Sequence, residues 1–116
     1  MNQELMTSIE SNHTLAMEYA ESAHEARRRG DSAGASQKFA DAFLLEKQAA
    51  EAMAPFVDIE PTRSILLRSA ASLALECKRD DEAERLACLG LSGTPPVDIK
   101  TELRDVLMMI WKPATR

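Results

Sequence analysis

The fold is decided by residues Ser64–Val97, which read SILLRSAASLALECKRDDEAERLACLGLSGTPPV. Leucine and alanine recur at helical spacing on both sides of the polar segment KRDD, and the stretch closes on a Gly-Thr-Pro-Pro turn. Ala71 and Ala83 stand where two helices would touch, and such small side chains allow helix backbones to approach closely. The pattern predicts two short helices folded into an antiparallel hairpin.

The residues before and after this hairpin also predict helices. Gly30 interrupts a long apolar repeat near the N-terminus, and Pro55 ends the repeat that follows it. Asp80 and Asp81 are expected to act as N-terminal caps of the fourth helix. The segment after Trp111 is expected to be loose. The five predicted helices cover, in order, residues 3–29, about 33–54, 61–78, 82–91 and 97–111.

Composition indicates one all-α domain spanning residues 1–116. A chain of 116 residues suffices for one hydrophobic core, and no run alternates apolar and polar residues as a strand would. Within this domain we expect a first hairpin over about residues 3–54, a second over about 61–92, and a capping helix over about 97–111. Phe56 in the connector should fold back onto the core, and Trp111 should close over the second hairpin.

Charge, cysteine content and hydropathy limit the classes of function. The formal net charge of -5 argues against a general nucleic-acid binder, which needs a basic surface. Cys77 and Cys88 lack metal-binding spacing and are expected to be reduced and buried. The N-terminus has no signal-peptide pattern, and no apolar run reaches the roughly 18 residues that span a bilayer. We therefore expect a cytoplasmic protein that does not bind membranes.

Two segments aligned on their turns resemble the tetratricopeptide repeat. In residues 16–49, Ala23, Gly30, Ala35, Phe39 and Ala42 match the small, turn and buried positions of the repeat. Residues 64–97 repeat the pattern, with small residues at Ala71, Ala83 and Gly90 and a closing proline at Pro95, and they depart from it at Lys78 and Ala87. The resemblance implies a right-handed array of antiparallel helical hairpins, an α–α superhelix, in which the two units are offset by 48 residues.

A longer phrase extends the resemblance. The stretch EPTRSILLRSAASLALECKRDDEAERLACLGLSGTPP is similar to a group of small uncharacterised bacterial proteins that share the Pro-Thr-Arg-Ser opening and the Ser-Gly-x-Pro-Pro close. This similarity brings no catalytic residues and supports only the helical reading.

The sequence predicts no enzyme, no metal site and no cofactor. His13 and His24 lie eleven residues apart, which is about 16 Å along a helix at 1.5 Å per residue, so one metal ion cannot bridge them. The chain has neither a Gly-rich phosphate loop nor a nucleophile elbow. Asp80 and Asp81 already have a sufficient role as helix caps.

The resemblance instead implies a binding surface. In tetratricopeptide proteins the first helix of each hairpin lines a concave groove that receives a peptide or a helix of a partner. The positions of this chain that match the groove are Met17, His24, Arg27, Arg28, Arg68, Ser72 and Glu76. For Arg28 and Arg68 the alternative is that they are ordinary solvated arginines. The Lys and Asn pattern that captures a peptide C-terminus is missing at these positions.

The predicted function is therefore a non-catalytic protein–protein interaction module or scaffold. Two hairpins and one helix are fewer than the roughly three repeats that bury their own core, so we expect a homodimer as well as a protein or peptide partner. One alternative is a regulatory subunit or inhibitor of an adjacently encoded enzyme or toxin, and another is a ligand-binding or catalytic helical bundle. The residues expected at the dimer contact are Leu5, Met6, Ile9 and Tyr19.

Overall fold

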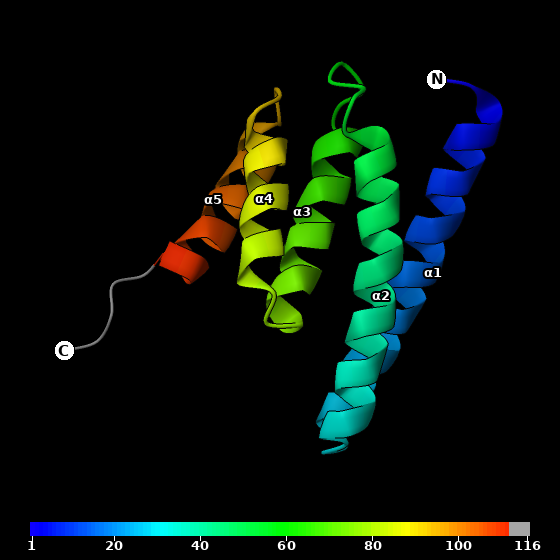
Figure 1. Ribbon diagram of the computed structural model, residues 1–116, viewed down its shortest axis with the longest axis vertical. Helices are drawn as coiled ribbons and strands as arrows, with labels where there is room; N and C mark the ends of the chain where they lie inside the picture. The colour runs from blue at the N-terminus through cyan, green and yellow to red at the C-terminus, as the bar shows by residue number, and fades with distance from the viewer. Residues whose placement is uncertain (112–116) are drawn as a thin grey trace.

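The computed structural model describes residues 1–111, and within them the chain forms five α-helices joined by short turns (Figure 1). The helices are α1 (Gln3–Arg28), α2 (Ser32–Met53), α3 (Thr62–Glu76), α4 (Asp80–Leu91) and α5 (Val97–Trp111). The expectation of an all-α protein with five helices is confirmed. The segment expected to be loose, residues 112–116, lies outside the described residues.

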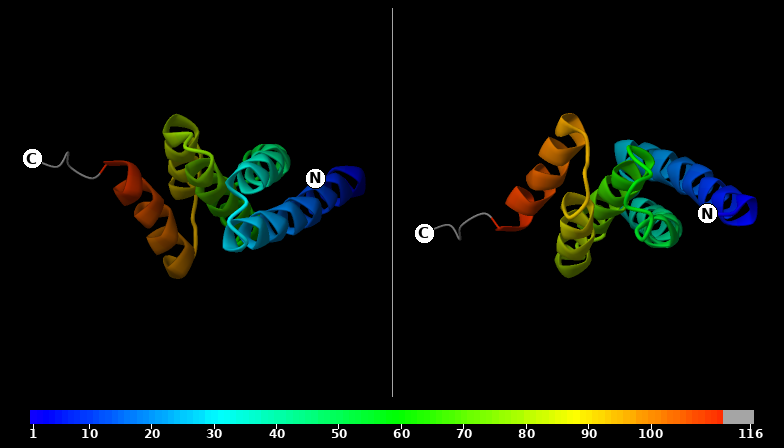
Figure 2. Two further views of the ribbon diagram at one scale, coloured as in Figure 1. Left: turned by 90° about the horizontal axis from the view of Figure 1, so that it is seen from below. Right: turned by 90° about the horizontal axis from the view of Figure 1, so that it is seen from above.

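Each helix packs mainly on its neighbours in the sequence. α1 lies against α2, α2 against α3, α3 against α4 and α4 against α5, while α3 also touches α5. Figure 2 places α1 and α5 on one side of the molecule with α3 between them, and α2 and α4 on the other side. The largest fully buried apolar side chains belong to four different helices and fill the space between the two layers: Phe39, Met53, Leu67, Leu86 and Leu103.

The two hairpin turns are built in the same way. In each, a residue with positive φ follows the helix end: Gly30 with φ of 81° and Lys78 with φ of 58°. Each turn is closed by the pair of hydrogen bonds that defines a Schellman motif. Their donors and acceptors are Gly30 N–H to Arg27 O (3.0 Å), Asp31 N–H to Ala26 O (2.9 Å), Lys78 N–H to Leu75 O (2.9 Å) and Arg79 N–H to Ala74 O (2.8 Å).

Replacing Lys78 by glycine should raise the free energy of unfolding by about 0.5–1 kcal/mol. The left-handed conformation costs a non-glycine residue about 1–2 kcal/mol, and glycine removes this cost. The greater conformational freedom of glycine in the unfolded chain offsets part of the stabilisation. Urea denaturation measures the difference. The control is Lys38→Gly, which lies within α2 and should instead destabilise the protein by about 1 kcal/mol. A loss of stability in Lys78→Gly would contradict the left-handed turn.

Small buried residues recur at the same 48-residue offset as the turns. They occupy the positions where the helices of each hairpin, and the hairpins themselves, come close together. Every member of this set is at most 5% exposed. The corresponding pairs are Ala16 and Ser64, Ala23 and Ala71, Ala26 and Ala74, and Ala35 and Ala83.

Two local expectations need correction. Asp80 and Asp81 lie inside the first turn of α4 rather than capping it, and the residue before the helix, Arg79, makes no capping hydrogen bond through its side chain. The acids instead complement the positive end of the helix dipole. Cys77 is half-buried and Cys88 is exposed, so the prediction of two buried thiols is wrong for Cys88. The reason is that Cys88 lies off the face of α4 that carries the buried Ala87.

A buried arginine joins the connector to the end of the second hairpin. Arg63 is only 2% exposed, and its Nε donates a hydrogen bond to the carbonyl oxygen of Ala54 (2.6 Å) while Nη2 donates to that of Leu89 (3.1 Å). A Cβ atom at Gly93 would stand 2.5 Å from Nη1 of Arg63, so only glycine fits there without displacement. The Pro-Thr-Arg-Ser and Ser-Gly-x-Pro-Pro segments thus meet in space. Phe56 packs against the core at partial burial, as expected.

Within residues 1–111, no helix has an apolar stretch long enough to cross a bilayer.

Candidate functional site

Two adjoining cavities form a groove along α3. The first, of about 370 Å³, lies between α3 and α5, and the second, of about 270 Å³, lies between α1 and α3. Arg68 and Ser72 line both cavities, so the two lie next to each other along α3. The helices on one side of the molecule, α1, α3 and α5, therefore all contribute to one groove.

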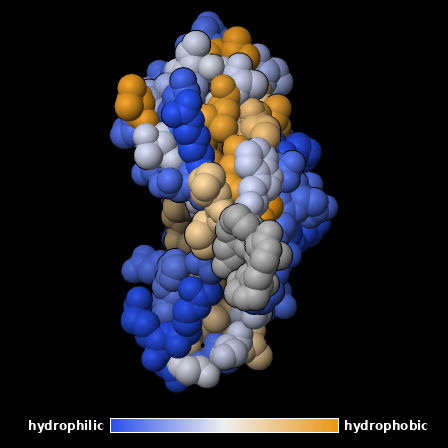
Figure 3. Space-filling view, turned by 90° about the vertical axis from the view of Figure 1, so that its left-hand side faces the viewer, coloured by the Kyte–Doolittle hydropathy of each residue, from blue (hydrophilic) through white to orange (hydrophobic). Residues whose placement is uncertain are grey.

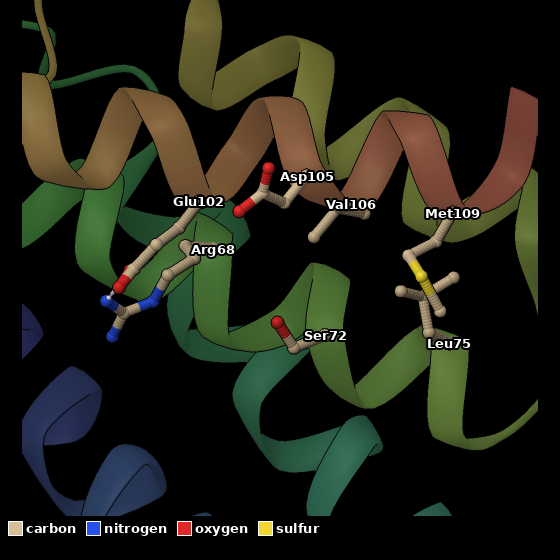
Figure 4. A pocket seen from close by; sticks show the side chains of 7 residues that line it. All are labelled: Arg68, Ser72, Leu75, Glu102, Asp105, Val106 and Met109. Carbon is tan, nitrogen blue, oxygen red and sulfur yellow. Dashed lines mark hydrogen bonds and ion pairs between the residues drawn. The ribbon is translucent and has the colours of Figure 1, made fainter.

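The α5 side of the groove combines an apolar wall with acidic groups. In Figure 4 the side chains of α5 project toward those of α3 across the cavity. Arg68 Nη1 donates to Glu102 Oε2 at 2.5 Å and bridges the two helices. The carboxylate of Asp105 points into the space between the helices, and within residues 1–111 it has no hydrogen bond or ion pair. The apolar wall consists of Leu75, Val106 and Met109.

The α1 side of the groove is held by a contact between α1 and α3. Arg27 Nη2 donates to Glu76 Oε1 at 2.9 Å, and the Arg27 guanidinium lies 4.7 Å from the centre of the Phe39 ring. The hydrogen bond and the negative charge of Glu76 raise the pKa of Arg27. His24 meets the edge of the same ring with a centroid distance of 5.1 Å. This end of the groove therefore presents the Phe39 ring, and the guanidinium beside it, that of Arg27, is already paired with Glu76.

A polar cluster lies beneath the groove, where α1, α2 and α3 meet. Glu46 of α2 has no exposed surface, and His13 Nδ1 of α1 lies 2.8 Å and 3.0 Å from its two carboxylate oxygens. Burial raises the pKa of Glu46 above its ordinary value, and hydrogen bonds from Ser69 and His13 together with the charge of Arg68 oppose that rise. Arg68, which pairs with Glu102 in the groove, thus also acts on the charge of Glu46.

Replacing Glu46 by glutamine should remove a pH dependence of stability. Because its pKa is raised, the folded protein binds this proton more tightly than the unfolded chain does. Below pH 4.5, the ordinary pKa of the carboxyl group, protonated Glu46 makes its full contribution to stability. This contribution is lost as the pH rises through the raised pKa of Glu46 in the folded protein. The free energy of unfolding of the wild type should thus fall relative to that of Glu46→Gln above about pH 4.5.

Urea denaturation at pH values between 4.5 and 7.5 measures this difference. The control is Glu18→Gln, which removes an exposed carboxylate from α1 and should follow the wild-type profile. Parallel profiles for the wild type and Glu46→Gln would contradict a raised pKa at Glu46.

The structure brings most of the predicted groove residues together. Met17, His24, Arg68, Ser72 and Glu76 line the groove, and Arg27 reaches it through its ion pair with Glu76. Arg28 lines neither cavity and is exposed near the end of α1.

The residues predicted at a dimer contact lie differently. Ile9 is 2% exposed and belongs to the core, so it is not part of an open surface. Leu5, Met6 and Tyr19 are partly buried and pack against that core. A homodimer stays a prediction, and a contact through this helix would have to use the remaining exposed parts of these three side chains.

Sequence reasoning missed the contribution of α5 and the buried acid of α2. Glu102, Asp105, Val106 and Met109 recur at intervals of three, one and three residues, which places them on one helix face. This spacing indicates that α5 has a face able to line a groove, but from the sequence α5 was assigned only the role of a capping helix. Glu46 falls in register with Phe39, Ala42, Ala49 and other buried residues of α2, and the register alone predicts that its carboxylate is buried.

The outer face of α5 carries exposed apolar side chains. Figure 3 shows apolar residues gathered on this side of the molecule, flanked by hydrophilic ones. Val97 and Met108 are each more than 60% exposed, and neither lines the groove. Trp111 donates through Nε1 to Glu84 Oε1 of α4 at 3.1 Å but is still 53% exposed, so it contacts the second hairpin without closing over it.

Comparisons with models of protein families, with curated proteins and with solved structures gave no match.

Proposed function

We propose that the protein is a non-catalytic interaction module that binds a peptide or helical segment of another protein in the groove along α3. The observation that carries the proposal is that two cavities adjoin along α3, with Arg68 and Ser72 lining both of them. Three helices contribute to the groove, which gives a path long enough to contact several residues of a bound segment. Its walls mix apolar and polar groups, as is usual for sites that recognise peptides.

A tetratricopeptide-like, right-handed hairpin array is part of the same proposal. It is supported by two hairpins with the same Schellman turn at Gly30 and Lys78 and by small buried residues at the same offset. The position of α1, α3 and α5 on one side of the molecule also agrees with it. In such an array these three helices are the ones that face a ligand.

The ion pairs of the groove connect the helices that line it. Arg27 pairs with Glu76, and Arg68 pairs with Glu102. These pairs link α1 to α3 and α3 to α5, and the groove is already formed without an occupant. A pre-formed groove lowers the entropy cost of binding, which is the property that an interaction module needs.

Ser72→Trp should abolish peptide binding and leave the fold intact. Ser72 is exposed at the centre of the groove, so an indole there fills the space that a peptide would occupy. We expect a random 12-residue peptide display library to yield sequences that bind the wild type and bind Ser72→Trp at least tenfold more weakly. Fluorescence anisotropy with the selected synthetic peptides measures the affinities.

The matched control is Gln48→Trp, which adds the same indole to an exposed site on α2, in the opposite layer. It should bind the selected peptides like the wild type. If the library yields no peptide that distinguishes Ser72→Trp from Gln48→Trp, the proposed function is wrong.

A further inference from the structure

The charged side chains of the groove do not balance. Three carboxylates line it or border it, on Glu76, Glu102 and Asp105, and they face two arginines. Arg27 is committed to Glu76 and to the face of the Phe39 ring. Arg68 is committed to Glu102. Asp105 is the carboxylate left without a partner among the described residues, so the groove has an excess of negative charge.

The unpaired carboxylate stands beside the most apolar part of the groove. Asp105 and Val106 are consecutive on α5, and Met109 lies one turn further along the same face. Leu75 of α3 faces Met109 across the cavity in Figure 4. An occupant of this cavity would meet apolar side chains and a carboxylate at the same time.

We propose that the occupant of the groove is a basic, partly apolar peptide segment of another protein. This inference rests on the proposed function and specifies its partner. An apolar side chain of the segment packs on Leu75, Val106 and Met109, and a neighbouring lysine or arginine pairs with Asp105. Glu102 lies one turn away on α5, where its charge is already paired with Arg68.

The net charge of the whole protein also favours a basic partner. The net charge of -5 attracts a basic partner over long range and repels an acidic one. The two arginines of the groove offer little to an acidic peptide, because binding it would require breaking their existing ion pairs. The selectivity for basic segments therefore comes from both the local and the overall charge.

The peptides selected for groove binding test this inference. We expect them to be enriched in lysine or arginine next to leucine, isoleucine, valine or methionine. Asp105→Lys should weaken their binding about tenfold or more through like-charge repulsion, and Asp105→Asn should weaken it about two- to fivefold through loss of an exposed pair. Raising NaCl from 50 to 300 mM should weaken wild-type binding more than that of Asp105→Asn.

The control for charge is Asp58→Lys, which makes the same change at an exposed residue of the connector that lines neither cavity. It should bind the peptides within about twofold of the wild type, because exposed charges beyond the screening length interact weakly. Thermal unfolding followed by circular dichroism confirms that each variant is folded.

The outcomes separate the two proposals. Peptides that depend on Ser72 but are neutral or acidic, or that bind Asp105→Lys as well as the wild type, would overturn the basic partner and leave the proposed function standing. An equal loss of binding in Asp105→Lys and Asp58→Lys would also overturn it, because the effect would then be one of net charge alone. A library without any Ser72-dependent peptide overturns both proposals.

Discussion

Arg63→Ala should lower the free energy of unfolding by about 3–5 kcal/mol, a large part of the 5–15 kcal/mol typical of a small domain. The guanidinium is buried and donates to the carbonyl oxygens of Ala54 and Leu89, which belong to the ends of two different helical hairpins. Alanine leaves the carbonyl of Ala54 without this donor and that of Leu89 with the Ser92 hydroxyl alone, and it leaves Glu60, whose Oε2 atom is buried, without the nearby positive charge. Urea denaturation followed by circular dichroism measures the loss.

Two further variants make this test specific. Arg63→Lys keeps the charge but lacks the planar fork that reaches two carbonyls, so it should still cost about 1–3 kcal/mol. Arg85→Ala removes an arginine whose ion pairs with Glu51 and Glu82 are exposed, and it should cost only about 0.2–1 kcal/mol. If Arg63→Ala were as mild as Arg85→Ala, the buried hydrogen bonds of Arg63 would not hold the hairpin ends together.

Leu103→Ala should cost about 2–5 kcal/mol by opening a cavity between α4 and α5. Leu103 has no exposed surface, and its two methyl groups lie against Gly90. A Cβ atom at Gly90 would stand 2.9 Å and 3.0 Å from the Cδ atoms of Leu103, closer than carbon atoms normally approach. In the wild type, Gly90→Ala should therefore destabilise the protein by about 1–3 kcal/mol through overpacking.

In the presence of Leu103→Ala, the change Gly90→Ala should stabilise the protein instead of destabilising it. Once Leu103 is alanine, the methyl group at residue 90 enters the cavity, and Gly90→Ala should then stabilise the protein by about 1 kcal/mol through helix propensity. A double-mutant cycle by urea denaturation gives the coupling energy between the two sites. Additive effects would mean that Gly90 is not in contact with Leu103 and that α5 docks elsewhere on α4.

Local sequence patterns predicted the helices well because each pattern acts within one or two turns. The apolar repeats and the interrupting Gly30 and Pro55 give bounds for α1 and α2 within one or two residues of those observed. The fourth helix was predicted to begin at Glu82 because Asp80 and Asp81 favour capping positions, but they serve equally well in a first turn. Whether Asp80 and Asp81 precede the helix or form its first turn depends on where the turn ends. That turn has Lys78 in a left-handed conformation, which a lysine rarely adopts.

The groove was predicted only in part because its composition depends on how helices meet. Met17, His24 and Ser72 were found through the resemblance of two hairpins to a repeat. The contribution of Asp105 and Met109 requires that α5 lie beside α3, and no pattern within α5 specifies that contact. In the same way, the pairing of His13 with Glu46 joins residues 33 apart, and neither spacing nor composition links them.

Because each helix packs mainly on its neighbours in the sequence, the protein can unfold locally from its ends. Since α5 touches only α3 and α4 to a substantial extent, and α1 packs chiefly on α2, either end can detach without disrupting the helices in between. Amide hydrogen exchange should thus slow progressively from the two ends toward α3, which packs on three other helices. The groove, whose far wall is α5, would be dismantled by fluctuations too small to unfold the rest of the chain.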